Sequence, residues 1–323
     1  MTAVQKYSDT QKISVEHFSD SVIDEFIKSR KASANTNRTY RNSINQLVKF
    51  FAAKAITEPT TADVDNFIND LRAAKKSAST LRLYSTVTKL FFQWLNRRGL
   101  YRDVASDAAP LKIRKSTTHK KDALKDEQAK ALLGAVKGDS LIERRDRAII
   151  ALALQTGVRT CEISRANRGD LYQDDENWYL DVQGKGRVEK DATVRVAPAV
   201  ADLIFSYLDL RGGVGDSEPL FTSTSRNTNW QKNSYGVRLS EQSIGKMIKR
   251  YMKSVGIDDR RITAHSTRHF AATTAIKAGV DIREVSAMLR HTSLVVTAVY
   301  LHDLSVKTRR AELAVANSLF GAA

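Results

Sequence analysis

The sequence has a single cysteine, Cys161, among its 323 residues. One thiol cannot close an intramolecular disulfide, which excludes both a secreted disulfide scaffold and a cysteine-rich zinc module. Long apolar runs are also lacking, because the longest apolar-leaning stretch, residues 148–154, is far too short to span a bilayer. The first thirty residues contain no apolar core of a secretion signal. We therefore expect a cytoplasmic protein with no membrane partner.

Several common catalytic motifs are missing as well. The chain has no Gly-x-x-x-x-Gly-Lys-Ser/Thr phosphate loop, no Gly-x-Gly-x-x-Gly turn after a strand and no Gly-x-Ser-x-Gly elbow. His265 and His269 have the i, i+4 spacing of two zinc ligands on a helix. However, Ser266 stands where a zinc protease needs Glu, and no third ligand is suitably spaced. We expect no metal and no cofactor.

Positive charge is present in excess. The 52 Lys and Arg residues exceed the 36 Asp and Glu residues by sixteen, and the isoelectric point is near 9.8. A polyanion is the first partner to consider, because cations that neutralise phosphates release counterions. Charge alone favours nucleic acid but leaves acidic lipids and ribosomes open.

The N-terminal third has the periodicity of helices. Apolar residues recur at helical spacing, which predicts a four-helix domain over residues 17–105 after a tail at 1–16. Thr61 is the expected N-cap of the third helix, and Gly99 the expected end of the fourth. Residues 106–121 form an expected basic linker, which is either solvated or in contact with a phosphate backbone. Its cations are Lys112, Arg114, Lys115, Lys120 and Lys121.

The pattern changes over residues 122–323. The almost entirely apolar segment 146–156, followed by Gly157, predicts a buried helix with a glycine C-cap. Residues 178–182 and 193–196 are expected to pair as a hairpin, and 211–240 to be mostly loop. Further helices are expected over 244–255, from the N-cap Asp281, from Ser293 towards Tyr300, and over 306–319. The fold class is therefore mainly α with a small β-sheet, in two domains.

Six residues of this second domain could together carry out phosphoryl transfer without a metal: Arg159, Lys185, His265, Arg268, His291 and Tyr300. Guanidinium groups match the non-bridging oxygens of a phosphodiester and stay charged. Lys185, between two glycines, could give a proton to a leaving oxygen, and the histidines could move protons or bind the phosphate. A tyrosine phenol can attack phosphorus and form a covalent ester, which suits rejoining better than hydrolysis.

These residues and their neighbours resemble the tyrosine recombinase (phage integrase) family. The matching segments are Thr156-Gly157-Val158-Arg159-Thr160-Cys161-Glu162, the hairpin Lys185, His265-Ser266-Thr267-Arg268-His269, Leu289-Arg290-His291 and Tyr300. The resemblance implies that Arg159, His265, Arg268 and His291 surround the scissile phosphate. It further implies that Lys185 is the general acid for the 5′ oxygen, that Tyr300 forms a 3′-phosphotyrosyl link, and that Glu162 is a support.

The resemblance also implies a clamp on duplex DNA. The helical domain would be a SAM-like core-binding domain, and recombination of an inverted-repeat core site would pass through a Holliday junction within a homotetramer on two sites. The C-terminal segment would be exchanged between protomers. The short N-terminal tail favours a recombinase of the Xer or small mobile-element kind. Arg290 departs from the family pattern, which usually has Gly there, and the loop at 221–240 is longer than in compact members.

Plainer interpretations stand beside these. Arg159 and Glu162 could pair at i, i+3 on a helix surface. Tyr251, expected in a helix core, and Tyr235, expected in a loop, compete with Tyr300 for the role of nucleophile. His269 is expected to be a structural partner and Cys161 a small buried side chain. Two further functions remain open: a type IB topoisomerase that shares the catalytic set, and a non-catalytic DNA-binding protein with the same fold. The DNA sequence, the biological role and any accessory protein are not determined by the sequence.

Overall fold

The chain folds as two compact units, Met1–Lys115 and Ser116–Ala323. The structure is a computed structural model, and it describes residues 18–108, 123–184, 186–224, 236–298 and 300. The basic linker cations, Lys185 and the segment from 301 to 323 lie outside the described residues. Each unit has its own hydrophobic core.

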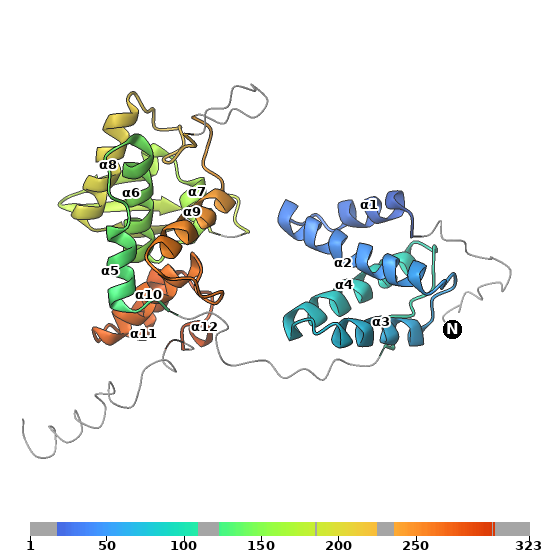
Figure 1. Cartoon of the computed structure of the whole chain (residues 1–323). Coiled ribbons are helices and arrows are strands. Elements are labelled where there is room, and N and C mark those ends of the chain that lie inside the picture. The colour runs from blue at the N-terminus through green and yellow to red at the C-terminus, as the bar shows by residue number, and fades with distance from the viewer. Residues whose placement is uncertain (1–17, 109–122, 185, 225–235, 299, 301–323) are drawn as a thin grey trace, which may run out of the picture. The chain divides into compact units, whose positions relative to one another are not determined.

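The first unit contains the four helices that the periodicity predicts (Figure 1). They are α1 (Asp20–Ser29), α2 (Ala34–Ala53), α3 (Thr61–Ala73) and α4 (Ala78–Arg97). Aromatic rings dominate the core, where the ring centroids of Phe26 and Phe91 are 5.2 Å apart in an edge-to-face arrangement that suits their quadrupoles. Because Ala105 and Ala108 are buried in the same core, the packed part of this unit extends to the last residue described before the linker.

The start of α3 differs from the prediction by one residue. Thr60, not Thr61, is the N-cap, and its hydroxyl accepts a hydrogen bond from the Asp63 amide. The Asp63 carboxylate in turn accepts from the Thr60 amide at 2.8 Å, which completes a capping box. The sequence has two adjacent threonines here, and only the carboxylate three residues after the first distinguishes them. The end of α4 is as predicted, since Gly99 adopts a left-handed φ of 67° directly after the C-cap.

The second unit is mixed but mainly helical. Its elements are α5 (Asp126–Gly134), α6 (Leu141–Thr156), α7 (Thr160–Arg165), the short 3₁₀ turn η2 (Arg168–Asp170), β1 (Leu171–Asp174), β2 (Asn177–Val182), β3 (Ala192–Val196), α8 (Pro198–Arg211), α9 (Glu241–Ser254), α10 (His265–Lys277), α11 (Ile282–Leu289) and α12 (Leu294–Ala298). In this unit α10, α11 and α12 lie side by side at one end (Figure 1).

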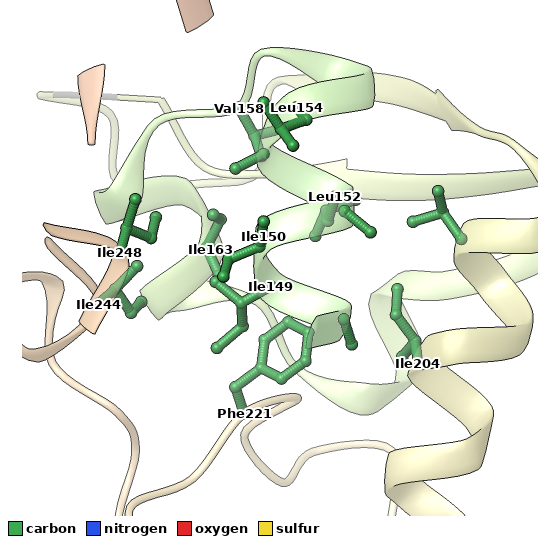
Figure 2. Close-up of a cluster of buried hydrophobic side chains, with 14 of the residues drawn as sticks. Ile149, Ile150, Leu152, Leu154, Val158, Ile163, Ile204, Phe221, Ile244 and Ile248 are labelled. Carbon is green, nitrogen blue, oxygen red and sulfur yellow. The ribbon is translucent and has the colours of Figure 1, made fainter. Parts of the chain in front are cut away.

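Helix α6 is the centre of this unit, as its apolar composition predicts. It contacts α5, α8, α9, α10 and β3, and Ile149, Ile150 and Leu152 are fully buried. Figure 2 shows these side chains meeting Ile204 of α8 and Ile244 and Ile248 of α9. The helix begins earlier than predicted because a capping box at Ser140 starts it, and it ends at the predicted glycine.

The small sheet is antiparallel in the order β1-β2-β3. The predicted hairpin is confirmed, with Leu180 of β2 opposite Val194 of β3. The sequence analysis missed β1, which pairs Leu171 with Leu180 on the other edge of β2. It also missed α5 and α8, although Pro198 in the first turn of α8 is a recognisable start signal. Among the described residues, no helix is long and apolar enough to cross a membrane.

Candidate active site

The first part of the site is the turn between α6 and α7. Gly157 ends α6 with φ 63°, a left-handed conformation that a side chain would strain. An added Cβ would also lie 2.9 Å from Leu289 Cδ2 and 3.2 Å from Ala271 Cβ, so only glycine lets α10 and α11 pack this closely against the turn. Arg159 follows two residues later as the N-cap of α7.

Glu162 holds Arg159 in place. Its Oε1 accepts a hydrogen bond from Arg159 Nη1 at 2.7 Å, and its Oε2 accepts one from the Arg159 backbone amide, also at 2.7 Å. The carboxylate is fully buried, which contradicts the alternative of an ordinary i, i+3 pair on a helix surface. Burial raises the pKa of Glu162, but the charge of Arg290 and hydrogen bonds from Arg159 and Arg290 outweigh it, so that the pKa is lowered.

Arg268 lies on α10 and is only 1 % exposed. Its Nη1 donates to the carbonyl oxygen of Gly157 at 2.7 Å, and its Nη2 donates to the carbonyl oxygen of Leu289. Burial, followed by the nearby charges of Arg159 and Arg290, lowers the pKa of Arg268 from 12.5 to about 10. At neutral pH the guanidinium therefore keeps its charge, and the ends of α6 and α11 are fixed around it.

His291 and Tyr300 lie next to each other in the site. The Nδ1 atom of His291 is 2.8 Å from the Thr297 hydroxyl oxygen, and the ring of Tyr300 stacks on the imidazole with centroids 6.2 Å apart. Burial, then the charges of Arg268, Arg159 and Arg290, lowers the pKa of His291 from 6.5 to about 4. At neutral pH His291 is therefore a neutral imidazole.

Two more imidazoles complete the row of rings. His265, exposed at the start of α10, lies 5.1 Å from the ring of His269. The His269 ring is itself 5.1 Å from that of Tyr300, in an edge-to-face arrangement. His269 is buried at 2 %, as a structural role predicts, and Tyr300 is equally buried. Cys161 is buried beside this site, as predicted, and desolvation raises the pKa of its thiol.

Arg290 is a member of the cluster that the motif did not assign. It ends α11 in a left-handed conformation, φ 54° and ψ 48°, and its Nη2 donates to Glu162 Oε2 at 2.6 Å. The departure from glycine at this position was visible in the sequence. The sequence could not reveal the partner of Arg290, because Glu162 is 128 positions away in the chain.

The hairpin expected to carry Lys185 is tied to α7. Arg165, on the last turn of that helix, donates from Nη1 to the carbonyl oxygen of Gly184 at 2.8 Å. Gln183 closes the other side by donating to the carbonyl oxygens of Arg187 and Val188 at 2.8 and 2.7 Å. Lys185 itself lies outside the described residues, but its neighbour Gly184 is anchored to α7, the helix whose N-cap is Arg159.

The structure thus brings together most of the residues that the motifs predict: Arg159, Glu162, His265, Arg268, His291 and Tyr300. Three guanidinium groups, two of them paired with one buried carboxylate, form together with a neutral imidazole and a phenol a site suited to a phosphate ester. No group of three or more His, Cys, Asp or Glu side chains suitable for a metal ion occurs in the described part of the chain.

Comparison with known proteins identifies the family of the chain. The phage integrase family matches residues 122–306, and the phage integrase N-terminal SAM-like domain matches residues 4–99. The chain therefore belongs to the phage integrase family. It is a tyrosine site-specific recombinase, an enzyme of the XerC and XerD kind.

Its relatives match over most of their length. Tyrosine recombinase XerC of Roseiflexus castenholzii is 30 % identical, with 84 % of each chain covered. Tyrosine recombinase XerC of Neisseria gonorrhoeae is also 30 % identical, over 87 % of this chain and 89 % of the relative. Tyrosine recombinase XerA of Pyrococcus furiosus is 27 % identical, over 86 % of this chain and 88 % of the relative.

Solved structures share the fold. XerH site-specific recombinase bound to palindromic difH substrate, in a post-cleavage complex, has a TM-score of 0.67 and 19 % identity, with 92 % of this chain and 84 % of that chain covered. A lambda integrase tetramer bound to a Holliday junction has a TM-score of 0.64 and 16 % identity, with 90 % and 78 % covered. These likenesses establish the fold of the chain.

Proposed function

We propose that Tyr300 is the nucleophile of this recombinase and that Arg159, Lys185, His265, Arg268 and His291 act on the scissile phosphate. The observation that carries the proposal is the convergence of α7, α10, α11 and α12 on one cationic cluster beside a single buried phenol. Arg268 donates to the carbonyl oxygen of Leu289, two residues before His291, and the His291 ring stacks on that of Tyr300. Glu162 joins Arg159 to Arg290, the neighbour of His291 in the chain. These groups are therefore close enough to act on one phosphodiester.

In this mechanism the Tyr300 hydroxyl gives its proton to an imidazole of the site, its oxygen attacks phosphorus, and the bond to the 5′ oxygen of the next nucleotide breaks. The arginines stabilise the charge that develops on the non-bridging oxygens, and Lys185 gives a proton to the leaving 5′ oxygen. The product is a 3′-phosphotyrosyl ester, which a 5′ hydroxyl of another strand can attack in reverse. Since Tyr300 is only 2 % exposed, its ring has to move towards solvent before it can reach a phosphate on DNA.

The reaction as proposed needs neither metal nor cofactor, because guanidinium groups supply all the charge stabilisation. Cleavage should accordingly proceed at an unchanged rate in excess EDTA. Loss of cleavage in EDTA, restored by Mg²⁺, would instead indicate a nuclease-like mechanism.

We further propose that the substrate is duplex DNA with an inverted-repeat core site, recombined through a Holliday junction by a homotetramer on two sites. Two relatives in fold are described as bound to a palindromic substrate and to a Holliday junction. A net charge of +16 supports a duplex partner. The linker cations Lys112, Arg114, Lys115, Lys120 and Lys121 would contact the DNA backbone, so neutralising all five should reduce the slope of log affinity against log salt by up to about 0.9 for each lost contact.

The C-terminal segment is proposed to dock on a neighbouring protomer. An open apolar cavity of about 270 Å³ lies between α5, α6, α8 and α10, lined in part by Leu133, Leu154, Val200 and Phe270. Leu133 is 38 % exposed although it is a large apolar side chain. The apolar residues of 306–319 suit such a surface.

The direct test is formation of a covalent adduct. An inverted-repeat duplex, selected from a randomised library by binding to the protein, is nicked so that the strand released by cleavage diffuses away. The wild-type protein should form an adduct that survives denaturing electrophoresis, and Tyr300→Phe should bind the duplex and form none. Tyr251→Phe is the matched control, since Tyr251 donates to Asp146 away from the cluster, and it should form adduct. Adduct formation by Tyr300→Phe at the wild-type rate would refute the assignment.

A further inference from the structure

Arg159, Glu162 and Arg290 form a buried ion triad. Glu162 is fully buried and accepts a hydrogen bond from each guanidinium, at 2.7 Å from Arg159 and 2.6 Å from Arg290. The Arg290 side chain is 12 % exposed, less than the 27 % of Arg159. Arg159 is therefore the more exposed of the two cations that bind Glu162.

The charge of the triad depends on Arg290. A buried pair of Arg159 and Glu162 alone would be neutral, and the carboxylate would cancel much of the field that Arg159 exerts on a phosphate. With Arg290 bound to the second carboxylate oxygen, two cations face one anion and the triad keeps a net charge of +1. Arg159 then stays held by Glu162 while the site as a whole remains positive.

Arg290 also holds the turn that carries two other parts of the site. Its Nη1 donates to the carbonyl oxygen of Met288 at 2.7 Å, in the last turn of α11. The preceding residue, Leu289, gives its carbonyl oxygen to Arg268, and the next residue is His291. A non-glycine residue in the left-handed conformation is strained, so the contacts of the Arg290 side chain have to offset that strain.

We propose that Arg290 is a positioning residue of the recombinase, which keeps the Arg159–Glu162–Arg290 triad at a net charge of +1 and fixes the turn between Leu289 and His291. Both Nη atoms donate within the protein, the Nε is buried, and the side chain is only 12 % exposed, so we assign Arg290 an action through Arg159 and the turn and not on the phosphate itself. The inference rests on the proposed function, because the triad matters to cleavage only if Arg159 acts on the phosphate.

Charge-balanced variants separate this role from a merely structural one. Arg290→Gly removes one cation while glycine adopts the left-handed backbone freely, so that the triad becomes neutral. Glu162→Gln combined with Arg290→Gly removes one cation and one anion and returns the net charge to +1. Arg290→Lys keeps the charge without the two-pronged hydrogen bonding. Arg283→Gly, in the exposed first turn of α11, is the matched control for loss of one arginine from this helix.

The readout is the single-turnover rate of adduct formation on the nicked duplex at saturating protein. We expect Arg290→Gly to lower the rate of adduct formation by about tenfold or more. The double variant should be at least about threefold faster than Arg290→Gly, and Arg283→Gly should stay within about twofold of wild type. Arg290→Lys should fall between wild type and Arg290→Gly. The proposal is overturned if Arg290→Gly cleaves within about twofold of wild type, or if the double variant is no faster than Arg290→Gly.

A second readout needs no DNA and no activity. The groups around His291 are Arg159, Arg268, Arg290, His265, the Thr297 hydroxyl and the Tyr300 ring. Removing the Arg290 charge should raise the midpoint at which the His291 ring titrates by NMR in the DNA-free protein, and Arg283→Gly should leave it unchanged. An unchanged midpoint in Arg290→Gly would contradict the proposal that the charge of Arg290 acts on the site. If the wild-type protein formed no adduct, the proposed function would fail, while this titration would still decide the charge role of Arg290.

Discussion

The Nη1 atom of Arg268 donates a hydrogen bond to the carbonyl oxygen of Gly157 at 2.7 Å, although the two residues are 111 positions apart in the chain. This contact joins the C-terminal end of the central helix to α10, the helix that also carries His265. Arg268 is buried at 1 %, so a residue assigned to the phosphate also holds the fold around the phosphate site together. The two roles have to be separated when variants of this position are measured.

Arg268→Ala should therefore lower stability as well as activity. The carbonyl oxygens of Gly157 and Leu289 would lose a charged donor, and a buried cavity would remain. We expect a loss of at least about 2 kcal/mol, which corresponds to a fall of roughly 4–8 °C in Tm for a unit of this size. Calorimetry of the full-length protein measures it, with Arg283→Ala as the exposed arginine control. An unchanged Tm for Arg268→Ala would show that the buried contacts contribute nothing.

His291 should make stability depend on pH in a defined window. Its pKa is about 4 in the folded protein and 6.5 ordinarily, so the unfolded chain binds more protons between those values. The free energy of unfolding should be highest above pH 6.5 and should fall as the pH drops towards 4. Glu162, whose folded pKa is lowered below its ordinary 4.5, adds a further loss as the pH falls below about 4.5.

Unfolding in urea at pH 7 and at pH 5 tests this window. His291→Asn keeps a polar group near Thr297 but cannot titrate, and it should show a smaller difference between the two pH values than the wild type. Equal differences in the two proteins would mean that the imidazole is not held neutral in the folded state.

Lys185 can be tested through the leaving group. A duplex whose scissile 5′ bridging oxygen is replaced by sulfur releases a thiolate, which needs no proton from a general acid. Lys185→Ala should lose about 10²-fold or more in cleavage of ordinary DNA and recover most of it on the sulfur-bridged duplex. Lys190 lies in the same hairpin but pairs with Asp170. Lys190→Ala should therefore have the same cleavage rate relative to wild type on both substrates. An equal defect of Lys185→Ala on both would argue against proton donation.

Deleting residues 306–323 should spare binding to a single site and remove cooperative assembly and recombination. Leu133→Glu, which places a charge at the apolar cavity, should do the same, whereas Leu210→Glu on an exposed part of α8 should not. Mobility shifts on one-site and two-site duplexes measure both steps. If the truncated protein pairs two sites and recombines them at the full-length rate, the segment is only a local cap on its own domain.

Local patterns predicted the fold class well, and they succeeded where the signal lies within one helix or hairpin. The N-cap Asp281 of α11, the left-handed Gly157 and the β2–β3 pairing all depend on neighbours in sequence. The order of the motifs likewise pointed to Arg159, His265, Arg268, His291 and Tyr300 as one cluster. The missed elements α5 and α8 have mixed faces whose burial is decided by α6, which they pack against.

The remaining features of the site depend on tertiary contacts. No periodicity reveals that Glu162 pairs with Arg290, or that Arg268 donates two hydrogen bonds to backbone carbonyl oxygens. The depressed pKa of His291 has the same origin, since it needs burial and three cations from three elements. Sequence reasoning predicted which groups take part, and the structure shows which contacts hold these groups in place.

The account depends most on Tyr300 as the residue that becomes linked to DNA. Trypsin digestion of the covalent adduct, followed by nuclease trimming and mass spectrometry, locates the link directly. We predict a nucleotide phosphate on Tyr300 within the peptide of residues 291–307, joined through a 3′ phosphate, with a free 5′ hydroxyl on the released strand. A nucleotide on any other residue, or a link through a 5′ phosphate, would contradict the account.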